Sequence, residues 1–370
     1  MFQDIKRNSM HKKETEKFLL NLDNGIQLDI MGKKGEKFVV EFWNDQQLVY
    51  SSLIESGMFS KLTAKYYSPW KCIVKDVKGN IHYEHCVNLQ GQNVLVSIDS
   101  SSLGDNLAWF PQVYEFSKIH GCKLHCKTFF NELFRENYPD VNFIEPSNVA
   151  GKFYAKYTIG YFYGEDLFMY TPIDPRTIPL AQTAASILGI PYKEIIPNIG
   201  KTWKNLHSRK VCIATHSTAK AKYWLRENGW QDIIDYLVLM GYEVCVINRE
   251  KNELQNVTDM SGEKPLGDRI QTLIECDFFI GLGSGLSWLA WALGVPVIMI
   301  SGFSSPFTEF SCYRVHNNTV CNSCWNDIAH KFDKGNFNWC PRNSDFECSK
   351  KISSIAVISE ILKIEHDYSK

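Results

Sequence analysis

The feature that most constrains the fold is an alternation of short apolar runs with helix-patterned segments. It begins near residue 92 and starts again after Trp203. Strands that alternate with helices predict a parallel sheet covered by helices. Two successive cycles predict an α/β protein with two doubly wound, Rossmann-like domains. In such sheets ligands bind beyond the carboxyl ends of the strands, so the loops at those ends are the first place to look for chemistry.

The predicted elements follow from hydrophobic period and turn residues. Strands are expected at 94–98, 123–125, 141–144, 211–214, 242–247, 278–280 and 295–300. Helices are expected at 107–119, 129–134, 178–188, 223–240 (with a break at Gly229), 269–275, 287–293 and 352–364.

The segment before these cycles has a different rhythm. Between about residues 22 and 90, apolar and polar residues alternate in short runs separated by turns such as Asn24-Gly25. This pattern predicts a β-rich, barrel-like domain, either a small barrel or a sandwich. We therefore expect five parts: a β-rich domain, a first and a second Rossmann-like domain, a metal finger and a C-terminal helix, at 1–91, 92–205, 206–310, 311–350 and 351–370.

Bulk composition excludes several classes of protein. The formal net charge is -1, which gives no general attraction to polyanions, so nucleic acid is not an expected partner. No apolar run approaches the roughly 18 residues of a membrane helix, and residues 1–17 lack the apolar core of a signal peptide. We therefore expect a cytoplasmic protein without a membrane span.

A cytoplasmic location determines how the twelve cysteines are interpreted, because disulfides are rare there. Eight are scattered among apolar stretches and are expected in the core. The other four cluster late in the chain, at Cys321, Cys324, Cys340 and Cys348. This spacing predicts a tetrathiolate site for one metal ion, and spacing alone does not choose between zinc and iron. Coincidence, or a redox dithiol at Cys321 and Cys324, remains the alternative.

Two strand-to-helix loops carry candidate catalytic groups. The first, 100–106, contains Asp105, which could be a catalytic carboxylate or only a helix N-cap. The second, 215–224, contains Ser217, Thr218 and Lys222. Hydroxyls and a lysine at a helix start can hold a phosphate, although a polar surface turn is the commoner identity of such a segment.

A third loop, Gly283-Ser284-Gly285-Leu286, lies between a predicted strand and helix. Glycines there would let the backbone approach a diphosphate, with the helix N-terminus aimed at it. The loop lacks the dinucleotide fingerprint and the P-loop lysine, which disfavours hydride transfer and ATP hydrolysis.

In these loops and in the cysteine spacing, the chain from about residue 92 onward resembles the bacterial autotransporter heptosyltransferases, which are related to the lipopolysaccharide-core heptosyltransferases. The Ser-Leu-Gly-Asp segment falls on 102–105, the Lys-x-Trp element on Lys222 and Trp224, and the donor loop on 283–286. The lipopolysaccharide enzymes have Asp-Thr-Gly followed by histidine where this chain has Gly283-Ser284-Gly285 and Trp288. That departure fits the autotransporter branch.

The resemblance implies a GT-B fold and an inverting transfer of heptose from ADP-heptose to serines of an autotransporter adhesin passenger. It implies that Asp105 is the base and that Lys222, Ser217, Thr218 and the Ser284 loop stabilise the departing ADP, without a catalytic metal. It also favours iron on the four cysteines and a homo-oligomer, up to a dodecameric ring. The alternatives are a lipopolysaccharide-core heptosyltransferase and a non-catalytic zinc-finger binding module.

Overall fold

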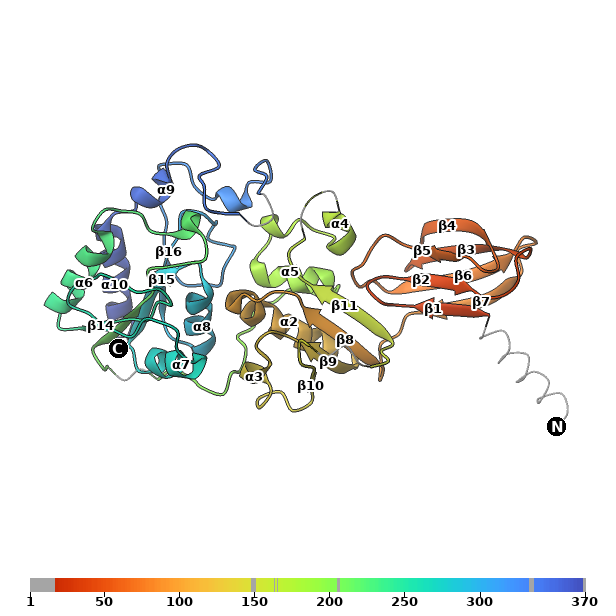
Figure 1. The fold of residues 1–370 in the computed structure, drawn as a ribbon, viewed down its shortest axis with the longest axis horizontal. Helices are drawn as coiled ribbons and strands as arrows, with labels where there is room; N and C mark the ends of the chain where they lie inside the picture. The colour runs from red at the N-terminus through yellow and green to blue at the C-terminus, as the bar shows by residue number, and fades with distance from the viewer. Residues whose placement is uncertain are drawn as a thin grey trace.

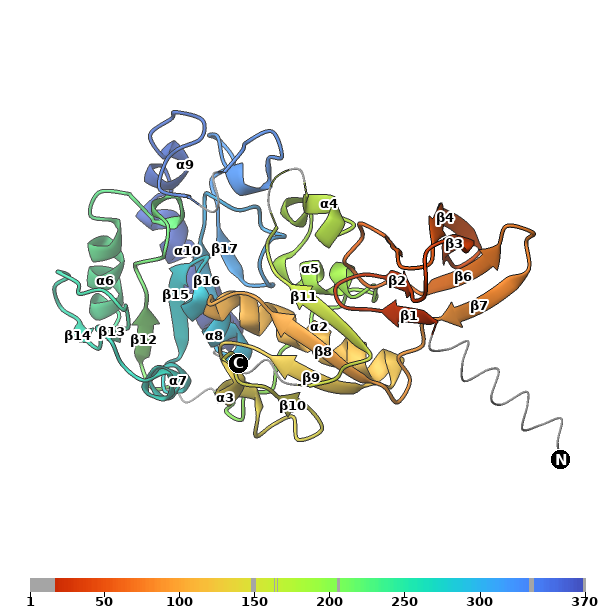
Figure 2. The same ribbon diagram turned by 45° about the vertical axis from the view of Figure 1, so that its right-hand side comes forward.

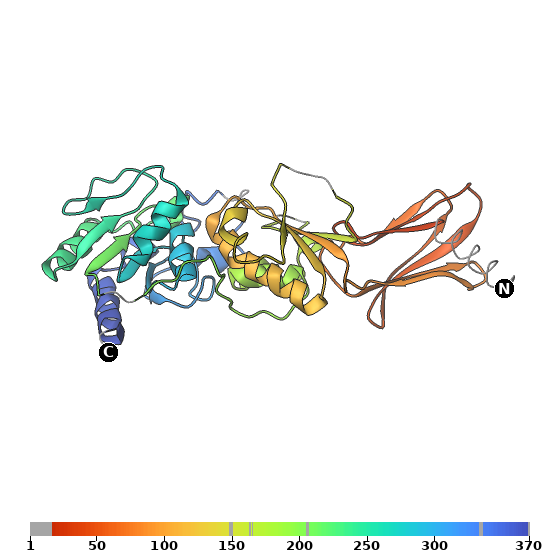
Figure 3. The ribbon, with the colours of Figure 1, turned by 90° about the horizontal axis from the view of Figure 1, so that it is seen from below.

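The computed structural model describes residues 17–147, 151–162, 164, 166–204, 207–332 and 336–368. Within them the chain forms an elongated row of three parts: the N-terminal strands, a first α/β unit and a second α/β unit (Figure 1). Viewed from below, the N-terminal strands project from the first unit, away from the second (Figure 3). No helix among the described residues is long and apolar enough to cross a membrane.

The N-terminal strands form two antiparallel sheets. One has the order β1-β2-β5, with β1 (Phe18–Asn21), β2 (Gln27–Ile30) and β5 (Phe59–Lys61). The other has the order β4-β3-β6-β7, with β3 (Lys37–Asn44), β4 (Gln47–Glu55), β6 (Trp70–Asp76) and β7 (Ile81–Cys86). Of the two expected forms, the described strands match the sandwich, in which Phe18 of β1 packs edge to face against Phe38 of β3, and they do not close into a barrel. The outer strand β4 is exposed over most of its length and pairs only with β3, so the sheet stays open there.

The first α/β unit is a parallel sheet of order β10-β9-β8-β11. Its strands are β8 (Asn93–Ile98), β9 (Lys123–Lys127), β10 (Asn142–Phe143) and β11 (Ala155–Ile159). Its helices are α2 (Leu103–His120), α3 (Asn131–Phe134), α4 (Leu167–Tyr170), η1 (Pro175–Thr177) and α5 (Leu180–Ile187). The sequence reading missed β11, which pairs with β8 along its whole length.

The second unit is a parallel sheet of order β14-β13-β12-β15-β16-β17. Its strands are β12 (Lys210–Ile213), β13 (Glu243–Val246), β14 (Thr258–Asp259), β15 (Phe278–Leu282), β16 (Val297–Ile300) and β17 (Tyr313–Val315). Its helices are η2 (Lys220–Lys222), α6 (Gly229–Leu239), α7 (Leu266–Ile274) and α8 (Gly285–Leu293). The helix expected from residue 223 begins only at Gly229, because Asn228 adopts a left-handed conformation with φ 53°.

The C-terminal part returns over the second unit. It contains η3 (Cys324–Asn326), α9 (Glu347–Lys350) and α10 (Ser354–Tyr368). Helix α10 packs against α6, β16 and β17 (Figure 2).

One apolar core joins the three parts. It contains Phe18 and Leu28 from the N-terminal strands, Phe110 and Phe116 from α2, and continues to Leu289 of α8. Helices α2 and α8 face each other across the boundary between the two α/β units. Because both helices begin at the carboxyl ends of strands, this packing brings the two sets of candidate loops together.

Candidate active site

The first wall of the site is the loop between β8 and α2. Leu103 begins the helix, Ser102 occupies the N-cap position, and Asp105 lies in the first turn. Ser100 Oγ donates a hydrogen bond to Asp105 Oδ2 at 2.6 Å. The alternative in which Asp105 is the N-cap is therefore wrong.

Burial dominates the electrostatics of Asp105. Protein surrounds the carboxyl group, which also borders a cavity, and this desolvation raises its pKa above the ordinary value. The positive charge of Lys222 and hydrogen bonds from Ser100 and Ser102 act in the opposite direction. Asp105 and Lys222 are therefore within electrostatic range of each other, although they belong to different α/β units. A carboxylate with a raised pKa is the stronger base.

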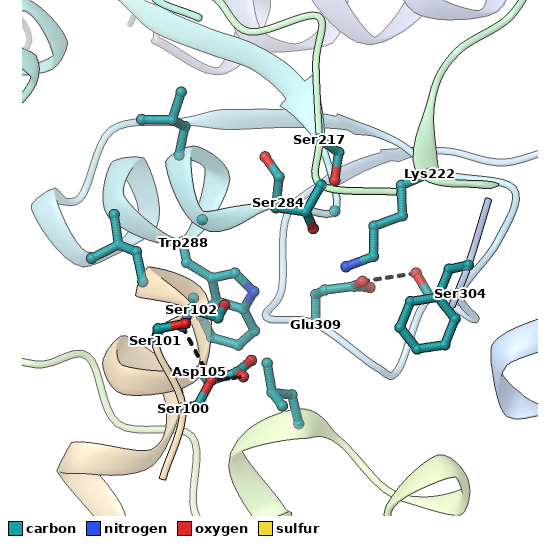
Figure 4. A pocket seen from close by; sticks show the side chains of 18 of the residues that line it. Ser100, Ser101, Ser102, Asp105, Ser217, Lys222, Ser284, Trp288, Ser304 and Glu309 are labelled. Atoms are coloured by element: carbon teal, nitrogen blue, oxygen red, sulfur yellow. Dashed lines mark hydrogen bonds between the residues drawn. The ribbon is translucent and has the colours of Figure 1, made fainter. Parts of the chain in front are cut away.

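The second wall follows β12 and contains Ser217, Thr218 and Lys222. A segment much later in the chain holds this turn: Ala221 N–H donates to Phe337 O at 3.0 Å, and Lys220 N–H donates to Asn338 Oδ1 at 2.9 Å. The Lys222 side chain extends toward Glu309 and Ser304 (Figure 4).

The third wall is the glycine-rich loop at the start of α8. Ser284 is the helix N-cap, and its Oγ is buried without a hydrogen-bond partner among the described residues. A Cβ on Gly283 would lie 2.8 Å from Glu309 Oε1, and one on Gly285 would lie 3.1 Å from Leu103 Cβ. We expected the absence of a side chain at Gly285 to leave room for a diphosphate. In the structure that room is taken by the start of α2, which belongs to the other unit.

The three loops enclose a cavity of about 600 Å³ between the two α/β units (Figure 4). All of the non-cysteine residues predicted as site residues line it, namely Asp105, Lys222, Ser217, Thr218, Gly283, Ser284, Gly285 and Leu286. One wall thus carries a partly buried carboxyl group. The facing wall carries an ammonium, hydroxyls and a helix N-terminus, which together suit an anionic leaving group.

Comparison with known proteins identifies the family. The model of glycosyltransferase family 9 (heptosyltransferase) matches residues 176–338. The autotransporter heptosyltransferase Aah from Escherichia coli is 34% identical over 376 residues, covering 94% of this chain and 95% of Aah. The chain belongs to the autotransporter heptosyltransferase family.

Further relatives place it within that family of glycosyltransferases. The crystal structure of TibC from enterotoxigenic E. coli H10407 superposes with a TM-score of 0.88 at 31% identity, covering 95% of this chain and 96% of TibC. TibC is described as an iron-containing dodecameric glycosyltransferase, and the two proteins share the GT-B-like architecture. BimC from Burkholderia thailandensis, described as an inactive autotransporter heptosyltransferase, is 34% identical over 82% of this chain and 76% of its own length.

The described cysteine side chains depart from the expected metal cluster. The thiols of Cys321, Cys324 and Cys340 lie close enough to Cys348 for their charges to add to burial, which raises the pKa of Cys348 to about 12. Even so, the residues that the structure describes contain no group of three or more His, Cys, Asp or Glu side chains arranged to bind a metal ion. The donor set suits zinc or iron chemically, but the described side chains do not form the expected cluster.

The segment that holds these cysteines nevertheless reaches the site. Trp325 and Phe337 line the cavity, whereas none of the four cysteines is among the residues that line it. The segment also contacts the first unit: Asn326 Nδ2 donates to Arg176 O at 2.7 Å, and the rings of Trp325 and Tyr161 pack edge to face. It therefore bridges the two units at the edge of the site.

Sequence reasoning missed several residues that line the cavity. Asn248, Arg249 and Glu250 follow strand β13, so the carboxyl-end rule could have found them. Glu309 and Phe303 had no such signal, because their position depends on a long loop after β16. Trp224 of the Lys-x-Trp element is buried instead, and its indole N–H donates to Ile352 O at 3.1 Å.

Proposed function

We propose that this chain transfers heptose from ADP-heptose to serine hydroxyls of an autotransporter adhesin passenger. The observation that carries the proposal is the placement of Asp105, partly buried and with a pKa raised by desolvation, across one cavity from Lys222. The relatives support the choice of substrates: they are named autotransporter heptosyltransferases, and TibC has been crystallised with ADP-D-beta-D-heptose.

The chemistry is a single displacement with inversion. Asp105 accepts the proton of the serine hydroxyl while that oxygen forms a bond to the anomeric carbon of heptose. The bond between this carbon and the diphosphate oxygen breaks, and ADP leaves with the bonding electrons. Lys222, the hydroxyls of Ser217 and Thr218, and the N-terminus of α8 at Ser284 stabilise the charge on ADP. These groups perform the task for which other transferases use a divalent ion, so the proposed mechanism has no catalytic metal.

We assign a structural role to one metal ion on Cys321, Cys324, Cys340 and Cys348. A tetrathiolate site has no open position for substrate, and it would hold together a segment whose only described elements are the short helices η3 and α9. Iron is the first candidate because TibC is described as iron-containing, and zinc is the alternative. We also propose that the protein forms a homo-oligomer, since TibC is described as dodecameric. We propose in addition that it is cytoplasmic and that it has the five domains whose boundaries are given in the sequence analysis.

The test incubates purified protein with ADP-heptose and a passenger fragment, and measures intact mass. The expected result is passenger carrying whole heptose increments, mapped to serines, with none added by Asp105→Asn. A parallel reaction with lipopolysaccharide-core acceptor tests the related activity. Transfer to the lipid acceptor alone would reassign the acceptor. No transfer, together with no binding of ADP, would leave a non-catalytic binding module.

A further inference from the structure

Glu309 is a buried acidic residue of the cavity that the mechanism above does not use. It lies in the loop between β16 and β17, and only 7% of its side chain is exposed. Ser304 Oγ donates to Glu309 Oε1 at 2.7 Å, and Arg314 Nη2 donates to Oε2 at 2.9 Å. The Arg314 side chain is itself only 10% exposed, so the two charges form a buried pair.

This pair leaves the carboxylate able to bind more. An ionised carboxylate can accept about four hydrogen bonds, and each Glu309 oxygen receives one from the residues just named. The donor loop also leaves room beside it. A Cβ on Gly283 would lie 2.8 Å from Glu309 Oε1, so glycine is the residue that spares this oxygen a steric clash.

The electrostatics indicate which ligand group Glu309 accepts. Arg314 compensates its charge, so the carboxylate can lie near Lys222 without cancelling the attraction of Lys222 for a diphosphate. A phosphate oxygen cannot donate a hydrogen bond to a carboxylate and is repelled by it. A sugar hydroxyl can donate, and a hydrogen bond to a charged acceptor is stronger than a neutral one.

The position of Glu309 agrees with a sugar ligand. In Figure 4 its carboxylate lies beside the Lys222 ammonium, and Asp105 lies across the same cavity from both groups. In the proposed reaction the diphosphate binds at Lys222 and the acceptor oxygen at Asp105, so the donor sugar occupies the space between them. We infer that Glu309 accepts hydrogen bonds from hydroxyls of the donor sugar and thereby selects the sugar. This inference rests on the proposed function.

The experiment compares wild type, Glu309→Gln and Glu309→Asp with ADP, with ADP-heptose and with a series of ADP-heptoses that each lack one hydroxyl. Calorimetry gives the Kd for ADP and the fraction of competent protein, and transfer assays give kcat/KM. For Glu309→Gln we expect a fall in kcat/KM of about 10- to 100-fold, the equivalent of one charge-assisted hydrogen bond. The Kd for ADP should stay within about twofold. With the wild-type protein, one deoxy donor should have a much lower kcat/KM than ADP-heptose. With Glu309→Gln, most of the difference in kcat/KM between these two donors should disappear.

A matched control separates this role from the loss of a buried ion pair. Glu41 in β3 is 12% exposed and accepts two hydrogen bonds from Lys75 Nζ, at 2.7 and 2.9 Å, far from the cavity. Glu41→Gln and Glu309→Gln should both lower the Tm, and only Glu309→Gln should change donor selectivity.

The inference is overturned if Glu309→Gln weakens ADP and ADP-heptose equally, or if each deoxy donor keeps its wild-type penalty in that variant. Glu309→Asp retains the charge and serves if the glutamine variant does not fold. An unchanged pattern of deoxy penalties in the folded aspartate variant would likewise overturn it. Failure of wild type to use ADP-heptose is a different result, because it refutes the proposed function itself.

Discussion

Gly104→Ala tests whether close contact between the two α/β units holds the start of α2 in place. A Cβ at Gly104 would lie 2.8 Å from Trp288 Cδ1, whereas ordinary contact begins near 3.4 Å. Trp288 cannot easily move, because it is 4% exposed and packs edge to face against Trp291 and Phe310, with ring centroids 5.2 and 4.8 Å away. The alanine must therefore push α2 away from α8.

The magnitude follows from two opposing effects. Replacing a helical glycine by alanine stabilises a helix by up to about 1 kcal/mol. Overpacking a rigid site destabilises by about 1–3 kcal/mol. Gly267→Ala is the matched control, because Gly267 lies in α7 and a Cβ there meets no atom within 4 Å. The free energy of unfolding of Gly104→Ala should be lower than that of Gly267→Ala by about 1–3 kcal/mol.

Urea unfolding of the two variants measures this difference. Because Asp105 is the next residue, displacement of α2 should also slow transfer by up to about 10²-fold while ADP binding is retained. If Gly104→Ala is as stable as Gly267→Ala and transfers heptose at the wild-type rate, the two units are not held at this contact and the reasoning is refuted.

Four other predictions concern the proposed chemistry and the cysteine segment. Asp105→Asn should keep ADP affinity and lose about 10²- to 10⁴-fold in transfer rate, measured by mass spectrometry. Burial raises the pKa of Asp105, and protonation removes the base, so the wild-type rate should fall with decreasing pH at a value above the ordinary 3.8. Lys222→Ala should weaken ADP binding by calorimetry, because it removes the charge facing the diphosphate. Cys324→Ser should lower metal content by elemental analysis and lower the Tm. It should also weaken ADP binding, since the cysteine segment holds the turn of Lys222.

Each of these has an outcome that contradicts it. Normal transfer by Asp105→Asn would refute the assignment of Asp105 as the base. A rate that falls only at the ordinary carboxyl pKa would refute the prediction that burial raises the pKa of the base. Equal ADP affinity of Lys222→Ala and wild type would place the donor elsewhere. A metal-free Cys324→Ser protein with wild-type Tm and ADP affinity would separate the cysteines from both stability and the site.

The strand-to-helix loops were predictable because a local pattern determines them. The apolar runs that became β8, β12 and β15 are short and end in polar or glycine residues, so the loops beyond their carboxyl ends could be located without any tertiary information. Strand β11 was missed although Ala155, Tyr157 and Ile159 alternate with polar residues. The helices that follow it, α4 and η1, are too short to show a helical hydrophobic period, so the strand-then-helix rhythm could not be recognised there.

What the sequence could not supply depends on packing between distant segments. The contact of Gly104 with Trp288, and the approach of Glu309 to Gly283, join positions with no common local pattern. The same is true of Phe337, whose carbonyl oxygen binds the backbone of the Lys222 turn. The helix predicted at 223–240 with a break at Gly229 is confirmed from Gly229 onward, but residues 223–228 are not helical. There the indole N–H of Trp224 donates to Ile352 O, a long-range contact without a local pattern.

The packing of the N-terminal sheets has a consequence for engineering. Tyr67 packs edge to face against Phe116 and Tyr157 of the first α/β unit, with centroids 5.6 and 5.9 Å away, and its N–H donates to Ile187 O at 2.8 Å. Deleting the first 91 residues would therefore expose Phe116 and Tyr157 to solvent and create a hydrophobic patch on the first α/β unit that favours aggregation. A chimaera that exchanges this region between relatives must carry a matching aromatic and the main-chain partner with it, or the graft will aggregate before its specificity can be measured.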